Sequence, residues 1–146
     1  MKEFLIPVLL RTEQCKAPRY AHPGDAGADL CAACDIELKP FERALIPTGI
    51  SVAIPKGYAG FVLPRSGLAI REGLSLVNSP GLIDSNYRGE VQVIAINLDP
   101  RQSITVHKDD RIAQLVIMQV EEAAFHVCDQ LDTTSRGASG FGSSGI

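Results

Sequence analysis

The chain alternates between short apolar runs and turn residues along most of its length. Runs that alternate, or that are rich in β-branched residues, cover 4–10, 36–39, 50–54, 58–63, 91–98, 104–106, 112–120 and 124–127. The breaks between runs carry Pro40, Pro47, Pro55, Pro64, Pro80 and Pro100. Short strands punctuated by turns in this way are typical of an antiparallel sandwich or barrel.

One segment, residues 66–72, has a helical pattern, and it is long enough for two turns at most. It follows Arg65, which ends an apolar run. Ser66 suits the N-cap of this helix. It equally suits the opening of an anion site, because helix N-termini attract phosphate and Arg65 adds positive charge. The residues alone leave both interpretations open.

Residues 78–91 read Asn-Ser-Pro-Gly-Leu-Ile-Asp-Ser-Asn-Tyr-Arg-Gly-Glu-Val. Apolar runs at 74–77 and 91–98 flank them, a pattern that predicts a β-hairpin. Asp84, Tyr87 and Arg88 lie within five positions of one another near its tip. An acid, a ring and a guanidinium crowded together suit a small, charged, partly flat ligand.

Length and composition narrow the possible classes. A chain of 146 residues, 45% of them hydrophobic, forms one domain with a core of its own. The net charge of -3 and the pI near 5.6 argue against a general nucleic-acid binder. No run approaches the roughly 20 apolar residues of a membrane span, and no signal-peptide pattern is visible. We therefore expect a cytoplasmic protein, or one in another reducing compartment.

The four cysteines are Cys15, Cys31, Cys34 and Cys128. The spacing of Cys31 and Cys34 is that of a zinc or redox motif. A zinc site needs four ligands, and the sequence offers neither a second such pair nor clustered histidines. Buried free thiols are therefore the favoured interpretation.

From about residue 133 the chain becomes rich in serine and glycine, which predicts a flexible arm. Residues 140–145 match GxGxxG, but a dinucleotide site requires a helix after that motif and only Ile146 follows. The arm is either a disordered terminus or a segment whose backbone N–H groups fold over an anion. Arg136 and Phe141 favour an arm that meets a surface.

Two further clusters carry polar residues at the edges of strands. Residues 25–30 place Asp25 and Asp29 in a turn that leads into a strand. In the strand that begins at Arg111, Gln114 interrupts an apolar face. A buried glutamine needs partners, so Gln114 is either a structural hydrogen-bonding residue or a ligand contact.

The order of these clusters resembles the five motifs of the trimeric dUTP diphosphatases (dUTPases). The matching segments are 26–30, 64–69, 78–91, 111–115 and 136–145. The resemblance implies an all-β, single-domain β-sandwich or jelly-roll-like barrel of the β-clip type, with one short helix. It also implies a β domain over 1–132 and a flexible C-terminal arm over 133–146 that closes over the active site.

The resemblance implies hydrolysis of dUTP to dUMP and pyrophosphate by Mg²⁺-assisted attack of water on the α-phosphorus. This reaction keeps uracil out of DNA and supplies dUMP for thymidylate synthesis. Asp84 matches the catalytic aspartate that orients and deprotonates the water. Asp29 matches the carboxylate that holds Mg²⁺ through water, with the triphosphate as the main carrier of the ion.

The resemblance also assigns substrate-binding positions. They are Arg65, Ser66, Gly67, Asn78, Gly81, Ile83, Tyr87, Gln114, Arg136, Phe141, Gly142 and Ser143. Among them, Tyr87 matches the ring beneath the deoxyribose, Phe141 the ring that stacks over uracil, and Arg136 the partner of the γ-phosphate. The implied assembly is a homotrimer with shared active sites, whose partner is dUTP rather than nucleic acid or a membrane.

Two alternatives share the implied fold. One is a relative of the dCTP deaminases, which use a catalytic glutamate, and Glu121 and Glu122 have no evident site around them. The other is a catalytically silent nucleotide-binding regulator. The chain departs from the family pattern at Ser139, where a glycine is usual, and at Leu82, where a smaller or β-branched residue is common.

Overall fold

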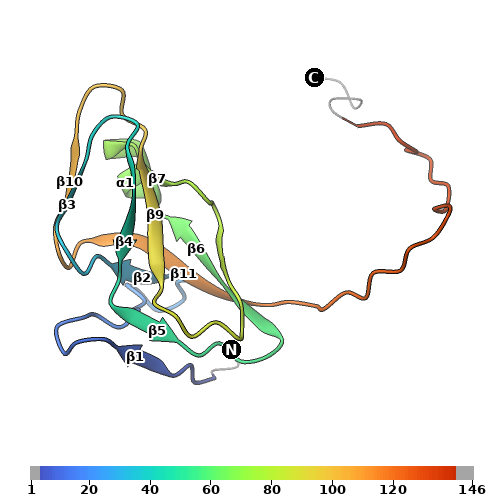
Figure 1. The fold of residues 1–146 in the computed structure, drawn as a ribbon, viewed down its shortest axis with the longest axis horizontal. Helices are drawn as coiled ribbons and strands as arrows, with labels where there is room; N and C mark the ends of the chain where they lie inside the picture. The colour runs from blue at the N-terminus through green and yellow to red at the C-terminus, as the bar shows by residue number, and fades with distance from the viewer. Residues whose placement is uncertain (1–3, 141–146) are drawn as a thin grey trace.

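The computed structural model describes residues 4–140 and contains eleven strands and one helix within them. The elements in chain order are β1 (Val8–Leu10), β2 (Ala28–Cys31), β3 (Ile36–Leu38), β4 (Arg43–Pro47), β5 (Ile50–Val52), β6 (Tyr58–Pro64), α1 (Ser66–Glu72), β7 (Leu74–Leu76), β8 (Gly81–Ile83), β9 (Gln92–Asn97), β10 (Ile104–Val106) and β11 (Arg111–Gln119). The expected dominance of short strands and the single short helix are confirmed (Figure 1).

The strands form four antiparallel sheets that enclose one core. The larger sheets have the strand orders β2-β11-β6-β8 and β4-β9-β7, and the pairs β1-β5 and β3-β10 complete the body. The most deeply buried large side chains are Leu30, Leu38, Ile46, Ile50, Ile54, Ile112, Val91, Val93 and Asn97. The predicted β-sandwich is confirmed, and over residues 4–140 the sheets stay separate instead of closing into a barrel.

Strand β11 joins the parts of the larger sheet. It pairs with β6 from Ala113 opposite Pro64 to Gln119 opposite Tyr58, and its first half also pairs with β2. Ile112, Ala113 and Leu115 are buried in the core, the first two of them consecutively. The register slips between Arg111 and Ala113, and such irregularities redirect the side chains beside them.

The segment at 78–91 is more than a hairpin tip. Strands β7 and β9 pair antiparallel, as the flanking apolar runs predict. Between them β8 crosses to the other sheet and pairs with β6, with Ile83 opposite Gly60 and Gly81 opposite Val62. The sequence pattern missed β8, because its three residues are too few to form a recognisable alternating run. The segment therefore links the two main sheets.

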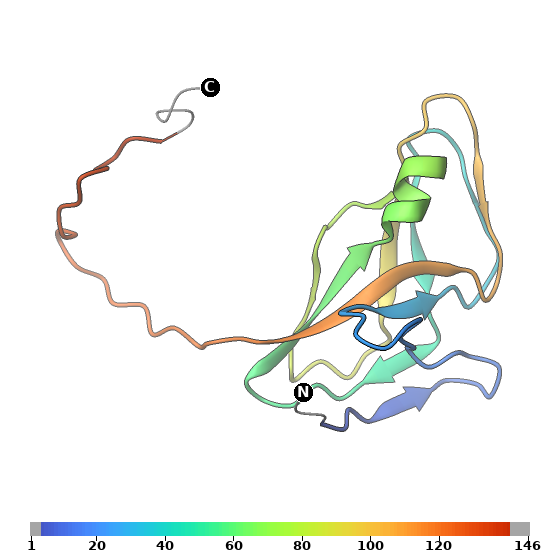
Figure 2. The ribbon, with the colours of Figure 1, turned by 180° about the vertical axis from the view of Figure 1, so that it is seen from behind.

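Two further differences between the sequence pattern and the structure concern strands. Strand β4 was not predicted, because its residues alternate only weakly in polarity and it begins and ends at Arg43 and Pro47. The strand predicted at 124–127 is wrong: this segment is exposed and unpaired in the described chain, and Phe125 is 97% exposed. Figures 1 and 2 show the chain leaving the body after β11 as an extended arm. Its apolar side chains have nothing in this single chain to pack on.

Helix α1 begins at Ser66, as predicted, but the N-cap position belongs to Arg65 and no side chain caps the helix. The N-cap interpretation of Ser66 is therefore wrong. The helix ends at Glu72, and the C-cap residue Gly73 has a φ of 73°, the left-handed conformation that glycine adopts at low cost.

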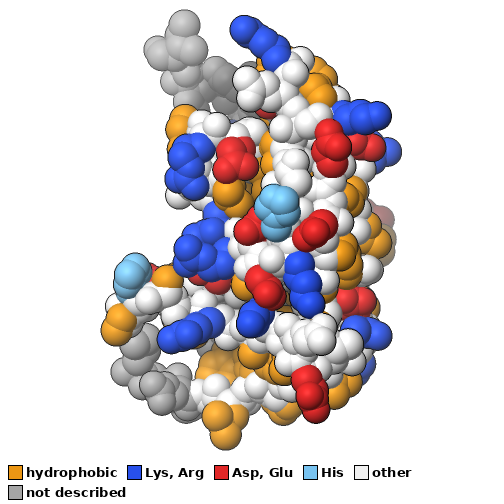
Figure 3. Space-filling view, turned by 90° about the vertical axis from the view of Figure 1, so that its left-hand side faces the viewer, with side chains coloured by type: hydrophobic (Ala, Val, Ile, Leu, Met, Phe, Trp, Pro, Cys, Tyr) orange, Lys and Arg blue, Asp and Glu red, His pale blue; other side chains and the backbone are white. Residues whose placement is uncertain are grey.

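The surface shows acidic and basic side chains interspersed across the face drawn in Figure 3. Within the described part of the chain, no helix has the length and apolar character that a membrane crossing requires.

Candidate active site

Residues of the 78–91 segment line one cavity, which we call the hairpin pocket. It is about 240 Å³ and is lined by Asn78, Gly81, Ile83, Asp84, Tyr87 and Glu90, with core residues behind them. This volume lies below the roughly 300–1,000 Å³ of typical small-molecule sites. The pocket therefore has room for part of a nucleotide, such as a base with its sugar. The structure brings together all five of the predicted site residues that lie in this segment.

Short-range hydrogen bonds shape the turn at the rim of the hairpin pocket. The backbone N–H of Tyr87 donates to the carbonyl of Asp84 at 3.1 Å. Arg88 Nη1 donates to the carbonyls of Ser85 and Tyr87, each at 2.8 Å. The Arg88 guanidinium thus fastens its own turn, which corrects the expectation that it joins Asp84 and Tyr87 on a ligand.

Gly81 lines this pocket at a point where space is short. A Cβ at this position would lie 3.2 Å from Asn78 Nδ2 and 3.4 Å from Val62 Cβ. A side chain there would press on Asn78 and narrow the pocket. Glycine therefore keeps the backbone of β8 open to a close approach by a flat group.

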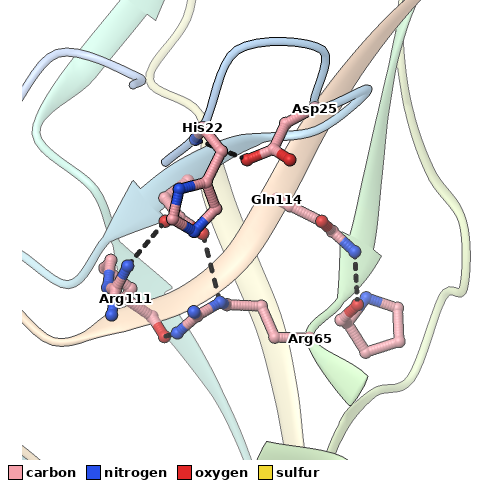
Figure 4. A network of polar contacts seen from close by, with 7 residues as sticks. His22, Asp25, Arg65, Arg111 and Gln114 are labelled. Atoms are coloured by element: carbon pink, nitrogen blue, oxygen red, sulfur yellow. Dashed lines mark hydrogen bonds and ion pairs between the residues drawn. The ribbon is translucent and has the colours of Figure 1, made fainter. Parts of the chain in front are cut away.

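A second set of residues, which we call the arginine cluster, consists of Asp29, Arg65, Arg111 and Gln114. Arg65 Nε and Arg111 Nη1 each lie 3.1 Å from a different oxygen of the Asp29 carboxylate. Arg65 Nη1 also donates to the Arg111 carbonyl at 2.9 Å. Figure 4 shows the two guanidinium groups close together, with Arg65 just after β6 and Arg111 at the start of β11. Only 13% of the Asp29 side chain is exposed, so this carboxylate is held by charge-assisted bonds away from bulk water.

Strand register brings Gln114 to the same place. Gln114 lies directly opposite Asp29 in the β2–β11 pair, so the two side chains share one face of the sheet. Gln114 Nε2 donates to the Pro64 carbonyl at 3.1 Å, just before Arg65. A Cβ on Gly27 would lie 2.5 Å from Gln114 Oε1, so only glycine leaves room for this side chain.

The arginine cluster lines an open cavity of about 490 Å³. Ser66 and Gly67 at the start of α1, and the 21–27 loop, complete its wall. The predicted residues Asp29, Arg65, Ser66, Gly67 and Gln114 are thus brought together, with Gln114 both structurally bonded and facing the cavity. Arginine and amide donors around an open cavity suit a phosphorylated ligand.

The two cavities are separate. Among residues 4–140, the linings of the hairpin pocket and of the arginine-cluster cavity have no residue in common. Asp84 and Tyr87 therefore belong to one set, and Arg65 and Gln114 to another. The hairpin pocket has the acid Asp84 beside a nucleoside-sized space, and the arginine-cluster cavity has the basic residues that suit phosphates. Neither cavity has both.

The predicted site residues of the arm lie apart from both cavities or outside the described chain. Arg136 is exposed, and its Nε donates to the Ser139 carbonyl at 2.9 Å within the arm. Phe141, Gly142 and Ser143 lie outside the described residues, as does most of the GxGxxG match. The boundary between domain and arm at 132/133 stays a prediction.

The four cysteines are free thiols, as expected, although Cys31 and Cys34 are half-buried instead of buried. Burial raises the pKa of Cys31, the carboxylates of Asp109 and Asp29 raise it further, and Arg111 acts weakly in the other direction. A raised pKa lowers the fraction of thiolate, which does not suit a nucleophilic cysteine.

Sequence reasoning assigned no site role to four residues that line these cavities. Arg111 stands in a quoted motif, but only the structure shows its contact with Asp29. His22 and Asp25 form a turn in which the His22 N–H donates to Asp25 Oδ2 at 2.8 Å, and both line the arginine-cluster cavity. Glu90 lines the hairpin pocket, and its position beside a glycine in the 78–91 segment was the available signal.

Comparisons with known proteins agree on one family. The dUTPase family model matches residues 13–145. The chain is 51% identical to a deoxyuridine 5'-triphosphate nucleotidohydrolase of Cutibacterium acnes over 146 residues, covering 100% of this chain and 95% of that protein. Over 128 residues it is 58% identical to the protein of the same name from Streptomyces avermitilis, covering 88% of this chain and 73% of that one.

A solved structure has the same fold. A variant dUTPase of Staphylococcus bacteriophage 80alpha with dUpNHpp superimposes with a TM-score of 0.89 at 28% identity, covering 97% of this chain and 99% of that one. The resemblance drawn from the five motifs is thus confirmed by sequence and by structure. The chain belongs to the dUTPase family, the enzymes that hydrolyse dUTP.

Proposed function

We propose that this chain hydrolyses dUTP to dUMP and pyrophosphate by attack of water on the α-phosphorus, with Asp84 as the base. One observation carries the proposal: the chain has two cavities. The first is nucleoside-sized with an acid at its rim, and the second is lined by residues that suit phosphates. Asp84 is exposed at the end of β8, where a water molecule can reach it. A positioned base of this kind contributes about 10²–10⁴-fold to the rate.

The hairpin pocket would recognise the deoxyuridine part of the substrate. Asn78, Gly81 and Ile83 come from the segment that β8 fixes against β6, so backbone groups there are held rigidly. Uracil differs from thymine by one methyl group, which close backbone packing at Gly81 excludes. The Tyr87 ring would lie under the deoxyribose, where a ribose 2′-OH clashes.

The arginine-cluster cavity would hold the phosphates. Arg65, Ser66, Gly67 and Gln114 supply donors, and a guanidinium suits phosphate oxygens in a fork-like pair. Charge stabilisation of this kind is a large share of catalysis in phosphoryl transfer.

The residues present fit Mg²⁺ bound through water. Each oxygen of the Asp29 carboxylate accepts one bond, Oδ1 from Arg65 and Oδ2 from Arg111. An ionised carboxylate can accept about four hydrogen bonds in all. The remaining sites can accept hydrogen bonds from metal-bound water, as suits an ion that gives up its water reluctantly. When bound to the triphosphate, Mg²⁺ would neutralise charge that develops on the phosphate oxygens. A variant dUTPase from phage phi11 of S. aureus coordinates a structural Mg(II) ion.

A complete site requires the two sets of residues to meet, which supports a homotrimer with shared sites. One chain would offer its hairpin pocket, a second its arginine cluster and a third its arm. The extended arm supports this arrangement, since Phe125, Val127 and Leu131 are 97%, 94% and 85% exposed. Arg136 would then pair with the γ-phosphate, and Phe141, Gly142 and Ser143 would close over the nucleotide.

Mixing two inactive variants tests the shared site. Asp84→Asn damages only the hairpin pocket, and Arg65→Ala only the arginine cluster. If each site draws the two residues from different copies, randomly mixed trimers carry about a quarter of their sites intact, because each residue is undamaged with probability one half. Co-refolding equal amounts should therefore restore about a quarter of the wild-type rate of pyrophosphate release. Complete inactivity of the mixture would place both residues of a site in one copy.

Substrate trials separate the proposal from its alternatives. Wild-type protein should release pyrophosphate and dUMP from dUTP, and should leave dCTP unchanged. Uracil nucleotides formed from dCTP would indicate a deaminase, and absence of any product would indicate a silent binding protein. The four free thiols support the expected cytoplasmic or otherwise reducing compartment.

A further inference from the structure

The position of the Tyr87 ring depends on the backbone of Gly89 and Glu90, which it contacts. Tyr87 Oη donates to the carbonyl oxygen of Glu90 at 2.9 Å. A Cβ on Gly89 would overlap the hydroxyl and the ring edge of Tyr87, so the ring lies directly over the Gly89 backbone. Any movement of the backbone at 89–90 therefore moves the ring.

That backbone is not held by the hairpin itself, since β9 begins only at Gln92. It is held instead by the turn between β4 and β5. The Gly49 N–H donates to Glu90 Oε1 at 2.8 Å, and the Val91 N–H donates to the Ile50 carbonyl at 2.8 Å. The Thr48 hydroxyl donates to the Val91 carbonyl in the buried interior.

The Glu90 carboxylate ties three segments together. Besides accepting from Gly49, it pairs through Oε2 with Arg11 Nε at 3.5 Å, and the Arg11 N–H donates to the Gly49 carbonyl at 2.8 Å. Its side chain is 21% exposed against 49% for Arg11. The bond to Gly49 is therefore the sheltered one, and the bond to Arg11 is largely screened by water.

We propose that Glu90 is a positioning residue that sets the preference for deoxyribose over ribose. Its carboxylate, bonded to the Gly49 N–H, fixes the backbone carbonyl that holds the Tyr87 hydroxyl. The inference rests on the proposed placing of the sugar against Tyr87. A ring that is fixed excludes a 2′-OH, whereas a ring that can move away makes room for it.

The test compares Glu90→Ala, Glu90→Gln and Arg11→Gln. The glutamine variant keeps a side-chain oxygen for the Gly49 N–H and loses only the charge. The ratio of kcat/KM for dUTP to that for UTP should fall about tenfold in Glu90→Ala, the effect of one sheltered hydrogen bond. It should stay within about threefold of wild type in the other two variants, since they keep that bond. The KM for dUTP should rise more than kcat falls, because β8 holds Asp84 independently.

A double variant guards against a general loss of packing. Tyr87→Phe removes the hydroxyl that Glu90 positions, so adding Glu90→Ala to it should cost little further selectivity. Full additivity of the two changes would overturn the proposal. An unchanged dUTP/UTP ratio in Glu90→Ala would do so as well, as would a Glu90→Gln variant that is as defective as Glu90→Ala.

A readout independent of activity separates this inference from the proposed function. Nitration by tetranitromethane, located by mass spectrometry, should modify Tyr87 several-fold faster in Glu90→Ala than in wild type or Glu90→Gln. Tyr20 and Tyr58 serve as internal references. Lack of dUTP hydrolysis by the wild-type protein would defeat the proposed function, while equal nitration rates at Tyr87 would defeat the positioning role.

Discussion

The hairpin pocket and the arginine cluster are built in opposite ways. Most of the hairpin pocket comes from one continuous segment, and its turn is fastened by hydrogen bonds between residues at most three positions apart. The arginine cluster joins residues 46 and 82 positions apart through Arg111, which contacts Arg65 and Asp29. The hairpin pocket is a local structure that the rest of the chain holds in place. The arginine cluster forms only when β2, β6 and β11 have paired. Changes to the first should therefore affect chemistry, and changes to the second should affect chemistry and folding together.

The largest expected effect is in the hairpin pocket. Asp84→Asn should lower kcat by about 10²–10⁴-fold, because the amide cannot accept the proton from water. Binding of dUpNHpp, measured by calorimetry, should stay near that of wild type, and the melting temperature should not change, since Asp84 is exposed. Glu37→Gln, at an exposed carboxylate on β3, is the matched control. Near-normal turnover in Asp84→Asn would remove Asp84 as the base.

The arm should come next. A chain that ends at Ser135 loses Arg136 and the residues proposed to close over the nucleotide, so activity should drop about 10²-fold. Folding should be unaffected, because the hydrogen bonds of Gly137 and Ser139 stay within the arm. Size-exclusion chromatography should show the same oligomeric state for the shortened and the full-length protein. Full activity in the shortened protein would reduce the arm to a passive terminus.

The arginine cluster should respond differently to the loss of its acid. Asp29→Asn leaves two guanidinium groups without their shared carboxylate, so stability should fall by about 1–3 kcal/mol. The Mg²⁺ concentration for half-maximal activity should also rise. Urea unfolding and a Mg²⁺ titration measure the two effects. If the Mg²⁺ requirement rises without any loss of stability, Asp29 does not serve both folding and Mg²⁺ binding, and the prediction is wrong.

The smallest effect is expected at Gly27. Gly27→Ala places a methyl group 2.5 Å from Gln114 Oε1, so the amide must move and the phosphate cavity changes shape. We expect about 1 kcal/mol of destabilisation and a modest rise in KM with kcat nearly unchanged. Adding Gln114→Ser removes the overlapping atoms and should recover the stability. If the double variant is no more stable than Gly27→Ala, the overlap with Gln114 is not the cause.

Much of the fold followed from the pattern of apolar residues. The helix at Ser66–Glu72 and strands such as β6, β10 and β11 were predicted with nearly correct bounds, because each is an apolar run ended by turn residues. Strand β8 was missed, because a three-residue strand gains its stability from β6 and not from its own pattern. The strand predicted at 124–127 has a suitable pattern, but no neighbour pairs with it in this chain.

By itself, the sequence determined the family, the order of the five motifs and the residue types of both cavities, since these depend on residue identity and spacing. Only the tertiary structure decided which residues meet. It separated Asp84 and Tyr87 from Arg65 and Gln114, bound the Arg88 guanidinium to the Ser85 carbonyl, and bound Glu90 to Gly49. The physical reason is that these contacts depend on strand register and chain crossing, which join residues far apart in sequence and leave no local pattern.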